Sequence, residues 1–191
     1  MYRLSVAFLK RMHPLDIKKL IQLIKATKQH EETMDGQAII LFLGKTGTGK
    51  STAVHFLAGS KMVATKMYGL DHIAPQGTRE GLSKNTALEE VGVSPHAKSE
   101  TRYVRAVPIE LENFCEYEGG SVILCDTPGF EDTGGPEINI ANGRGLIEAI
   151  KKCKNVRLLL LISYLDIGDK SQGIKAALHG LARRITDVEA Y

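Results

Sequence analysis

The chain has 191 residues, which is room for one domain with a sizeable core. Its 25 lysines and arginines stand against 22 aspartates and glutamates, so a formal net charge of +3 gives no charge argument for a nucleic-acid or membrane-surface partner. Hydrophobic residues make up 43% of the chain and charged residues 25%, which is the balance of an ordinary globular protein.

The cysteines and the N-terminal residues give information on the cellular compartment of the protein. The three cysteines, Cys115, Cys125 and Cys153, are odd in number and form no CxxC pair, so neither a disulfide framework nor a zinc site is favoured. This pattern predicts a reducing, cytoplasmic location, with Cys125 as a small buried hydrophobic residue. No stretch reaches the roughly 20 apolar residues of a membrane-spanning helix. Residues 1–13 carry basic and no acidic side chains, so a mitochondrial presequence stays open as the alternative.

The first part of the chain predicts a helix, a strand and a second helix. Residues 14–34 predict the first helix, because Pro14 suits a first turn and leucines recur near helical spacing. The apolar run at 38–43 predicts a buried strand of a parallel sheet. Residues 51–57 follow a glycine-rich loop and predict the second helix.

The remainder predicts one long irregular segment and a further alternation of elements. Repeated glycines and prolines predict no regular element for residues 60–96. The polar, glycine-rich residues 126–142 also predict a loop. We expect strands at 102–111, 121–125 and 156–164, and helices at 145–153 and 175–188. This alternation predicts an α/β layered fold with a largely parallel sheet of four strands.

A glycine-rich motif follows the first predicted strand. Residues 44–51 read G-K-T-G-T-G-K-S and match the P-loop pattern G-x-x-x-x-G-K-[ST], with a buried strand before it and a helix after it. Glycines let several backbone N–H groups approach a polyphosphate, and the next helix points its positive end at the anion. Lys50 is expected to bind the β- and γ-phosphates, and the Ser51 hydroxyl to bind magnesium. The predicted nucleotide contacts are Gly44, Lys45, Thr46, Gly47, Thr48, Gly49, Lys50, Ser51 and Thr52.

A second motif, Asp-Thr-Pro-Gly at 126–129, follows the apolar run 122–125. An acid at the carboxyl end of a parallel strand lies where α/β sheets bind ligands, so Asp126 is expected to hold magnesium directly or through water. Gly129 can offer its N–H to a γ-phosphate and lose that contact after hydrolysis, as a switch does. An ordinary strand-end turn is the alternative, and the P-loop upstream favours the ligand role.

The two motifs together resemble the G1 and G3 motifs of P-loop GTPases of the translation-factor-related class. The continuation to Phe130 is similar to septins and to AIG1-type GTPases, and the resemblance covers roughly residues 38–165. It implies a three-layer G domain with helices on both faces of the sheet, occupying 37–191 after an N-terminal helical extension at 1–36. It also implies GTP or GDP as the ligand, with Mg²⁺.

The resemblance further implies a switch I threonine that touches magnesium and the γ-phosphate. Thr101 is our choice, because it precedes a predicted strand and lies 25 residues before Asp126, a normal distance in the family. Thr78 and Thr86 are rivals, and a plain strand start is the alternative role for Thr101. The implied catalytic residues are Lys50, Thr101 and Gly129, and the implied metal ligands are Ser51, Thr101 and Asp126.

Two departures from the family pattern matter. The [NT]KxD motif that reads guanine is absent, and the chain ends after the helix expected before its strand, so we expect a G domain truncated at its C-terminus. Phe130 stands where Ras-like enzymes have the glutamine that orients water; Glu131 and Asp132 are weaker substitutes. We therefore expect slow hydrolysis, or a homodimer or protein partner across the nucleotide face that completes the site. Arg79, Arg102 and Arg105 show no arginine-finger pattern.

Three functions remain open from the sequence. The first is a GTP-binding protein with slow magnesium-dependent hydrolysis that acts as a switch or an assembly module. The second is a non-catalytic nucleotide-binding or pseudo-GTPase interaction module, which Phe130 and the absent guanine motif favour. The third is an ATP-dependent small-molecule kinase, which the P-loop alone allows and the Asp-Thr-Pro-Gly motif disfavours.

Overall fold

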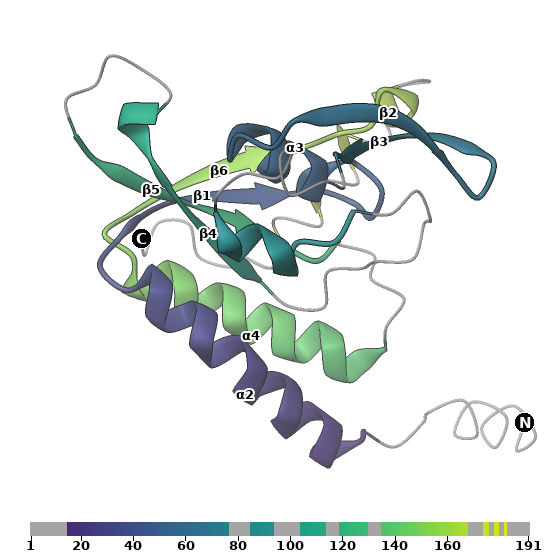
Figure 1. Ribbon diagram of the computed structural model, residues 1–191. Helices are drawn as coiled ribbons and strands as arrows, with labels where there is room; N and C mark the ends of the chain where they lie inside the picture. The colour runs from purple at the N-terminus through teal and green to yellow at the C-terminus, as the bar shows by residue number, and fades with distance from the viewer. Residues whose placement is uncertain are drawn as a thin grey trace, which may run out of the picture.

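The computed structural model describes residues 15–76, 85–93, 104–113, 119–129 and 135–167, together with residues 174, 175, 178, 179 and 182. Figure 1 shows a sheet with helices on both sides and a separate long hairpin. The helices are α2 (Ile17–Met34), α3 (Lys50–Leu57) and α4 (Pro136–Lys152), with short 3₁₀ turns η1 (Thr86–Glu90), η2 (Leu111–Asn113) and η3 (Tyr164–Ile167). The strands are β1 (Ala38–Leu43), β2 (Met62–Met67), β3 (Leu70–Pro75), β4 (Arg105–Glu110), β5 (Ser121–Asp126) and β6 (Asn155–Leu160).

The main sheet is mixed and mostly parallel. Its four strands have the order β4-β5-β1-β6. Strand β1 lies between β5 and β6 and is parallel to both, with Phe42 opposite Asp126 on one side and opposite Leu159 on the other. Strand β4 pairs with β5 in the antiparallel sense. The prediction of an α/β fold with a largely parallel sheet of four strands is confirmed.

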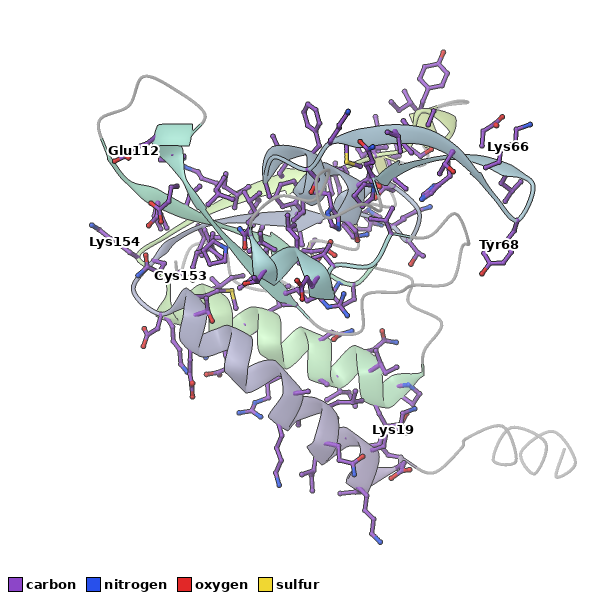
Figure 2. All side chains as sticks on the ribbon, viewed as in Figure 1. Lys19, Lys66, Tyr68, Glu112, Cys153 and Lys154 are labelled. Carbon is purple, nitrogen blue, oxygen red and sulfur yellow. The ribbon has the colours of Figure 1, made fainter. Side chains whose placement is uncertain are left out.

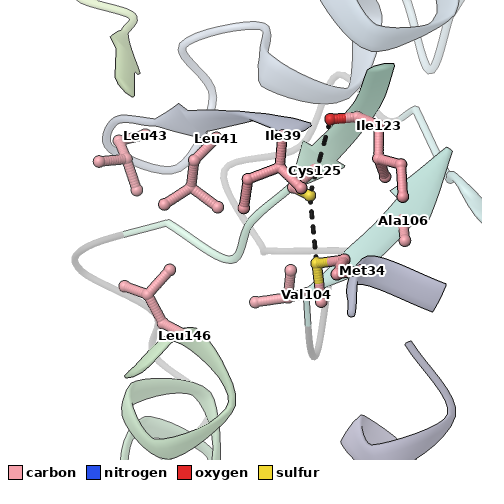
Figure 3. Packing of buried hydrophobic residues seen from close by; sticks show 9 residues of the cluster. All are labelled: Met34, Ile39, Leu41, Leu43, Val104, Ala106, Ile123, Cys125 and Leu146. Atoms are coloured by element: carbon pink, nitrogen blue, oxygen red, sulfur yellow. Dashed lines mark hydrogen bonds between the residues drawn. The ribbon is translucent and has the colours of Figure 1, made fainter. Parts of the chain in front are cut away.

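The core consists of two layers that β1 separates. Ile39, Leu41 and Leu43 pack with Met34 of α2 and Leu146 of α4 on one face (Figure 3). Phe42 points the other way and packs with a second group, which comes from α3, η1 and neighbouring strands: Val54, Ala58, Leu88, Val91, Val107 and Leu124. Successive side chains of a strand alternate between faces, so a continuous apolar run serves a sheet that is covered on both sides. Each fully buried side chain of this size contributes about 1.5–3 kcal/mol relative to an exposed one.

Helix α2 runs alongside α4, and hydrogen bonds join the two helices near both ends of α2. At its start, the Asp16 backbone N–H donates to Glu137 Oε1 at 2.9 Å, and the Asp16 side chain caps the helix by accepting from Lys19 N at 3.0 Å. At its end, Gly36 N–H donates to the Lys152 carbonyl at 2.9 Å. The predicted helix at 14–34 is confirmed from Ile17 onward, and Pro14 lies outside the described residues.

Cys125 is buried beneath this helical layer, as predicted. Its thiol lies 3.3 Å from Met34 Sδ (Figure 3), and burial raises the pKa of Cys125 far above its usual value. Cys153 is half-buried, and its Sγ donates to the Met34 carbonyl at 3.4 Å. Both described cysteines are free thiols, and Cys115 lies outside the described residues.

The prediction of no regular element for 60–96 is wrong for its first half. Strands β2 and β3 form an antiparallel hairpin with Met67 opposite Leu70. The two turn residues have positive φ, 55° at Tyr68 and 80° at Gly69, as a type I′ turn requires. Tyrosine is rare at a position with positive φ, and asparagine is the usual residue before the glycine of such a turn. The sequence therefore gives no Asn-Gly signal for this hairpin. Figure 2 shows Tyr68 at the tip, pointing away from the sheet.

The helix before β6 begins nine residues earlier than predicted. Pro136 starts α4, a position where its missing N–H costs nothing. The prediction began this helix at 145 because asparagines and glycines precede it. Burial of Ile138, Ala141 and Leu146 on the sheet side outweighs the weak helix propensity of Gly143.

Three other boundaries differ or fall outside the described part of the chain. Strand β6 ends at Leu160 rather than at residue 164, and β4 begins at Arg105, since the described Val104 lies outside the strand. The predicted helix at 175–188 is described only at 175, 178, 179 and 182, which are helical. Within the described residues, no helix is both long enough and apolar enough to cross a membrane.

Candidate nucleotide-binding site

The P-loop connects the end of β1 to the start of α3. Gly44 is buried and has φ 154°, and a Cβ there would lie 2.5 Å from the Leu161 carbonyl oxygen and 2.7 Å from Thr48 Oγ1. The segment after β6 is held against this point, because Leu161 N–H donates to the Leu43 carbonyl at 2.7 Å. Glycine at 44 therefore allows the loop to pass beneath the segment that follows the edge strand.

Lys50 lies folded back over the loop. Its side chain is 6% exposed, and Nζ donates to the carbonyls of Gly44 at 3.1 Å and Lys45 at 2.8 Å. The Thr48 hydroxyl also donates to the Lys45 carbonyl, at 2.9 Å. The loop thus holds one positive charge at its centre, beside the N-terminus of α3, where helix geometry favours an anion.

Ser51 and Asp126 meet at the carboxyl ends of β1 and β5. Ser51 Oγ donates to Asp126 Oδ2 at 2.8 Å, and Asp126 is fully buried. The next residue, Thr127, donates its hydroxyl to the Phe42 carbonyl, which ties the strand-end loop to β1. A hydroxyl and a carboxylate at this distance form a hard oxygen pair of the kind that Mg²⁺ prefers.

Gly129 packs directly on the P-loop. A Cβ at Gly129 would overlap Thr46 Oγ1 and would lie 2.5 Å from Thr46 N and 2.9 Å from Thr46 Cα. Gly129 is buried, so the close approach leaves no room for a side chain. The two sequence motifs therefore touch each other at Thr46 and Gly129 as well as at Ser51 and Asp126.

The described residues fit a polyphosphate with Mg²⁺. The glycine-built turn, the buried Lys50 and the Ser51–Asp126 pair bring donors, a cation and oxygen ligands to one end of the sheet. No group of three or more His, Cys, Asp or Glu side chains that could hold a metal occurs among the described residues. A magnesium ion bound by Ser51 and Asp126 would take its other ligands from phosphate oxygens, water or the predicted ligand Thr101.

The other residues named from the sequence lie outside the described residues or on other parts of the described elements. Thr101, the chosen switch I residue, lies outside the described residues, as do Thr78, Phe130, Glu131 and Asp132. Thr86 is exposed and begins η1. Thr52 lies half-buried in the first turns of α3.

Two residues near the site had no assigned role in the sequence. Arg105 stands opposite Asp126 in the antiparallel β4–β5 ladder, so both side chains face the same side of the sheet. His55 of α3 is buried, with Nε2 2.7 Å from the Val91 carbonyl and Nδ1 3.2 Å from Ser60 Oγ. No sequence signal marks the Arg105 register, because it depends on how β4 pairs with β5.

Comparison with protein-family models gives no match to the chain. Comparison with solved structures also gives no match. Among curated proteins, the chain is 30% identical over 135 residues to a protein of Arabidopsis thaliana named Translocase of chloroplast 90, chloroplastic. The match takes in 65% of this chain and 17% of the length of that protein. The chain is thus similar over most of its length to a small part of a plant translocase.

Proposed function

We propose that the chain is a GTP-binding protein with slow, magnesium-dependent GTP hydrolysis, acting as a nucleotide switch or an assembly module. One observation carries the proposal: Ser51 Oγ lies 2.8 Å from Asp126 Oδ2, a contact that joins the helix after the P-loop to the acid at the end of β5. Each motif alone could be an ordinary turn or a chance match. Together, a hydroxyl and a carboxylate beside a phosphate-binding loop are the groups that a metal-assisted phosphate site uses.

Phosphate binding falls to the loop from Gly44 to Ser51. Backbone N–H groups at the start of α3 face the anion, and Lys50 exchanges its bonds to the Gly44 and Lys45 carbonyls for phosphate oxygens. The same lysine then stabilises the charge that develops on the transferring phosphoryl group. The Thr48 hydroxyl, which donates to the Lys45 carbonyl, supports the loop from within.

Ser51 and Asp126 would hold the magnesium ion, and Thr101 is the proposed third protein group. Bound magnesium neutralises negative charge on the phosphates. Gly129, against the P-loop at Thr46, is the proposed γ-phosphate sensor through its backbone N–H. A loop that gains and loses this contact would transmit the state of the nucleotide to α4, which begins seven residues later at Pro136.

Guanine as the base rests on the family resemblance and on the likeness to the plant translocase, which supports a GTP-binding protein. Phe130 is apolar and cannot polarise water, so intrinsic hydrolysis should be slow. A second copy or a protein partner across the nucleotide face would then supply the missing group. A cytoplasmic location belongs to the same proposal.

The test is a thermal-shift titration with magnesium and GTP, GDP or ATP on three proteins: wild type, Lys50→Ala and Lys61→Ala. Lys61 is an exposed lysine just before β2 and serves as the matched control. Binding to the folded state at a hundredfold excess over Kd adds about 2.7 kcal/mol to the free energy of unfolding. We expect GTP to raise the midpoint of wild type and Lys61→Ala but not of Lys50→Ala. No shift in a cooperatively melting wild type would contradict the proposal.

A non-catalytic module is the second candidate, and Phe130 is the residue that favours it. Such a protein would show the same thermal shift with GTP and release no phosphate. Phosphate release measured on the GTP-loaded wild type separates the two candidates, and a rate above that of GTP alone in buffer supports the enzyme.

A further inference from the structure

Thr46 occupies an unusual place in the P-loop. Its hydroxyl oxygen is buried and has no hydrogen-bond partner among the residues that the structure describes. The other hydroxyls of the loop are engaged: Thr48 donates to the Lys45 carbonyl and Ser51 donates to Asp126. A valine of the same shape would fill this place without burying a hydroxyl that lacks a partner.

The position of this hydroxyl indicates which group of a bound nucleotide it would contact. Thr46 contacts Gly129 so closely that a Cβ there would overlap Oγ1. The hydroxyl thus lies at the junction of the P-loop with the strand-end loop, on the side where the proposed γ-phosphate sensor lies. An unpaired buried polar group in a native structure calls for an explanation, and a ligand that pairs with it is one.

We propose that Thr46 is a catalytic residue, whose hydroxyl touches the γ-phosphate end of the bound nucleotide and orients the attacking water. This inference rests on the proposed function. It assigns to Thr46 the orientation of water, a role that the apolar Phe130 cannot fill. A hydroxyl suits the task, because it accepts a hydrogen bond from water while it donates to a phosphate oxygen.

The reaction consumes water and GTP and yields GDP and inorganic phosphate. The water oxygen bonds to the γ-phosphorus, and the bond from that phosphorus to the bridging oxygen breaks, with its electron pair leaving on GDP. The protons of the water pass to phosphate and solvent. Thr46 is unchanged at the end, so its contribution is position and hydrogen bonding.

The experiment measures single-turnover GTP hydrolysis and GTP affinity, with magnesium, for wild type, Thr46→Val, Thr46→Ser and Thr65→Val. Thr65 is a half-buried threonine of β2, in the separate two-stranded sheet, and its variant is the control for a threonine-to-valine change. We expect Thr46→Val to bind GTP within threefold of wild type and to hydrolyse it about 100-fold more slowly. Thr46→Ser keeps the hydroxyl and should hydrolyse GTP within about fivefold of wild type.

The outcomes separate this inference from the proposed function. If wild type hydrolyses GTP and Thr46→Val matches it, the inference fails and the proposed function stands. If Thr46→Val loses GTP affinity together with rate, the hydroxyl serves binding or folding and the inference also fails. If wild type binds no GTP, the proposed function fails, and this inference fails too because it depends on that function. A rate loss confined to hydrolysis and restored by serine supports it.

Discussion

Ser51 and Asp126 are 75 positions apart in the chain, and a hydrogen bond of 2.8 Å joins the Ser51 hydroxyl to the buried Asp126 carboxylate. The bond links the first turn of α3 to the end of β5, so the helix that follows the P-loop has a fixed relation to the central sheet. If the pair binds magnesium as proposed, its two oxygens are already held side by side, so little reordering is needed when the cation binds.

Replacing Ser51 tests this pair. Ser51→Ala removes the hydroxyl that we propose as a magnesium ligand and leaves Asp126 without one of its hydrogen bonds, so we expect a loss of about 1–3 kcal/mol in the free energy of unfolding. Thermal-shift measurements with GTP should show that added magnesium raises the midpoint of wild type and not of the variant. Ser51→Thr keeps the hydroxyl and is the matched control. A full magnesium effect in Ser51→Ala would exclude Ser51 as a ligand.

Gly129 should tolerate no side chain. In Gly129→Ala the new Cβ would overlap Thr46, so the strand-end loop must move off the P-loop, and we expect the preference for GTP over GDP to fall at least tenfold. Gly143→Ala is the control, because a Cβ there meets nothing within 4 Å and helix propensity favours alanine by about 0.5–1 kcal/mol. Nucleotide titrations measure the preference, and urea unfolding measures stability. An unchanged preference in Gly129→Ala would remove Gly129 from the switch.

The Glu137 contact predicts an acid dependence of stability. The Asp16 backbone N–H, then the backbone N–H of Glu137 itself, and Lys19 hold the pKa of Glu137 below its usual value. A group whose folded pKa is lowered stabilises the fold above its unfolded pKa, and this contribution is lost as pH falls through the folded pKa. We expect the free energy of unfolding in urea to fall more steeply between about pH 6 and about pH 3 for wild type than for Glu137→Gln. Equal slopes would mean that the charge of Glu137 adds nothing to α2 docking.

Helix α2 should behave as part of the folded core. Met34 is 1% exposed and lies against Cys125, so Met34→Ala should cost about 2–5 kcal/mol of unfolding free energy. Ile21 of the same helix is 48% exposed, and Ile21→Ala should cost less than about 0.5 kcal/mol. Chemical denaturation measures both. A small effect of Met34→Ala would support the division that assigns residues 1–36 to a separate extension.

The chain order of the central elements could be predicted because their signals are local. The apolar runs 38–43 and 122–125 have no polar interruption, as expected for strands covered on both faces. The P-loop pattern likewise needs only neighbouring residues. The β2–β3 hairpin was missed because its turn places a tyrosine, not asparagine or glycine, at the first positive-φ position. The start of α4 was missed because its helical state depends on burial against the sheet.

The P-loop, the acid after the third predicted strand and the α/β alternation could all be predicted without a structure, because each depends on residues adjacent in the chain. Three relations come from the fold: Ser51 bonds to Asp126, Gly129 packs on Thr46, and Arg105 stands opposite Asp126. These relations follow from strand order and register. Strand pairing joins distant segments through backbone hydrogen bonds, which are the same for almost every residue type. The partner of a strand therefore cannot be predicted from its side chains alone.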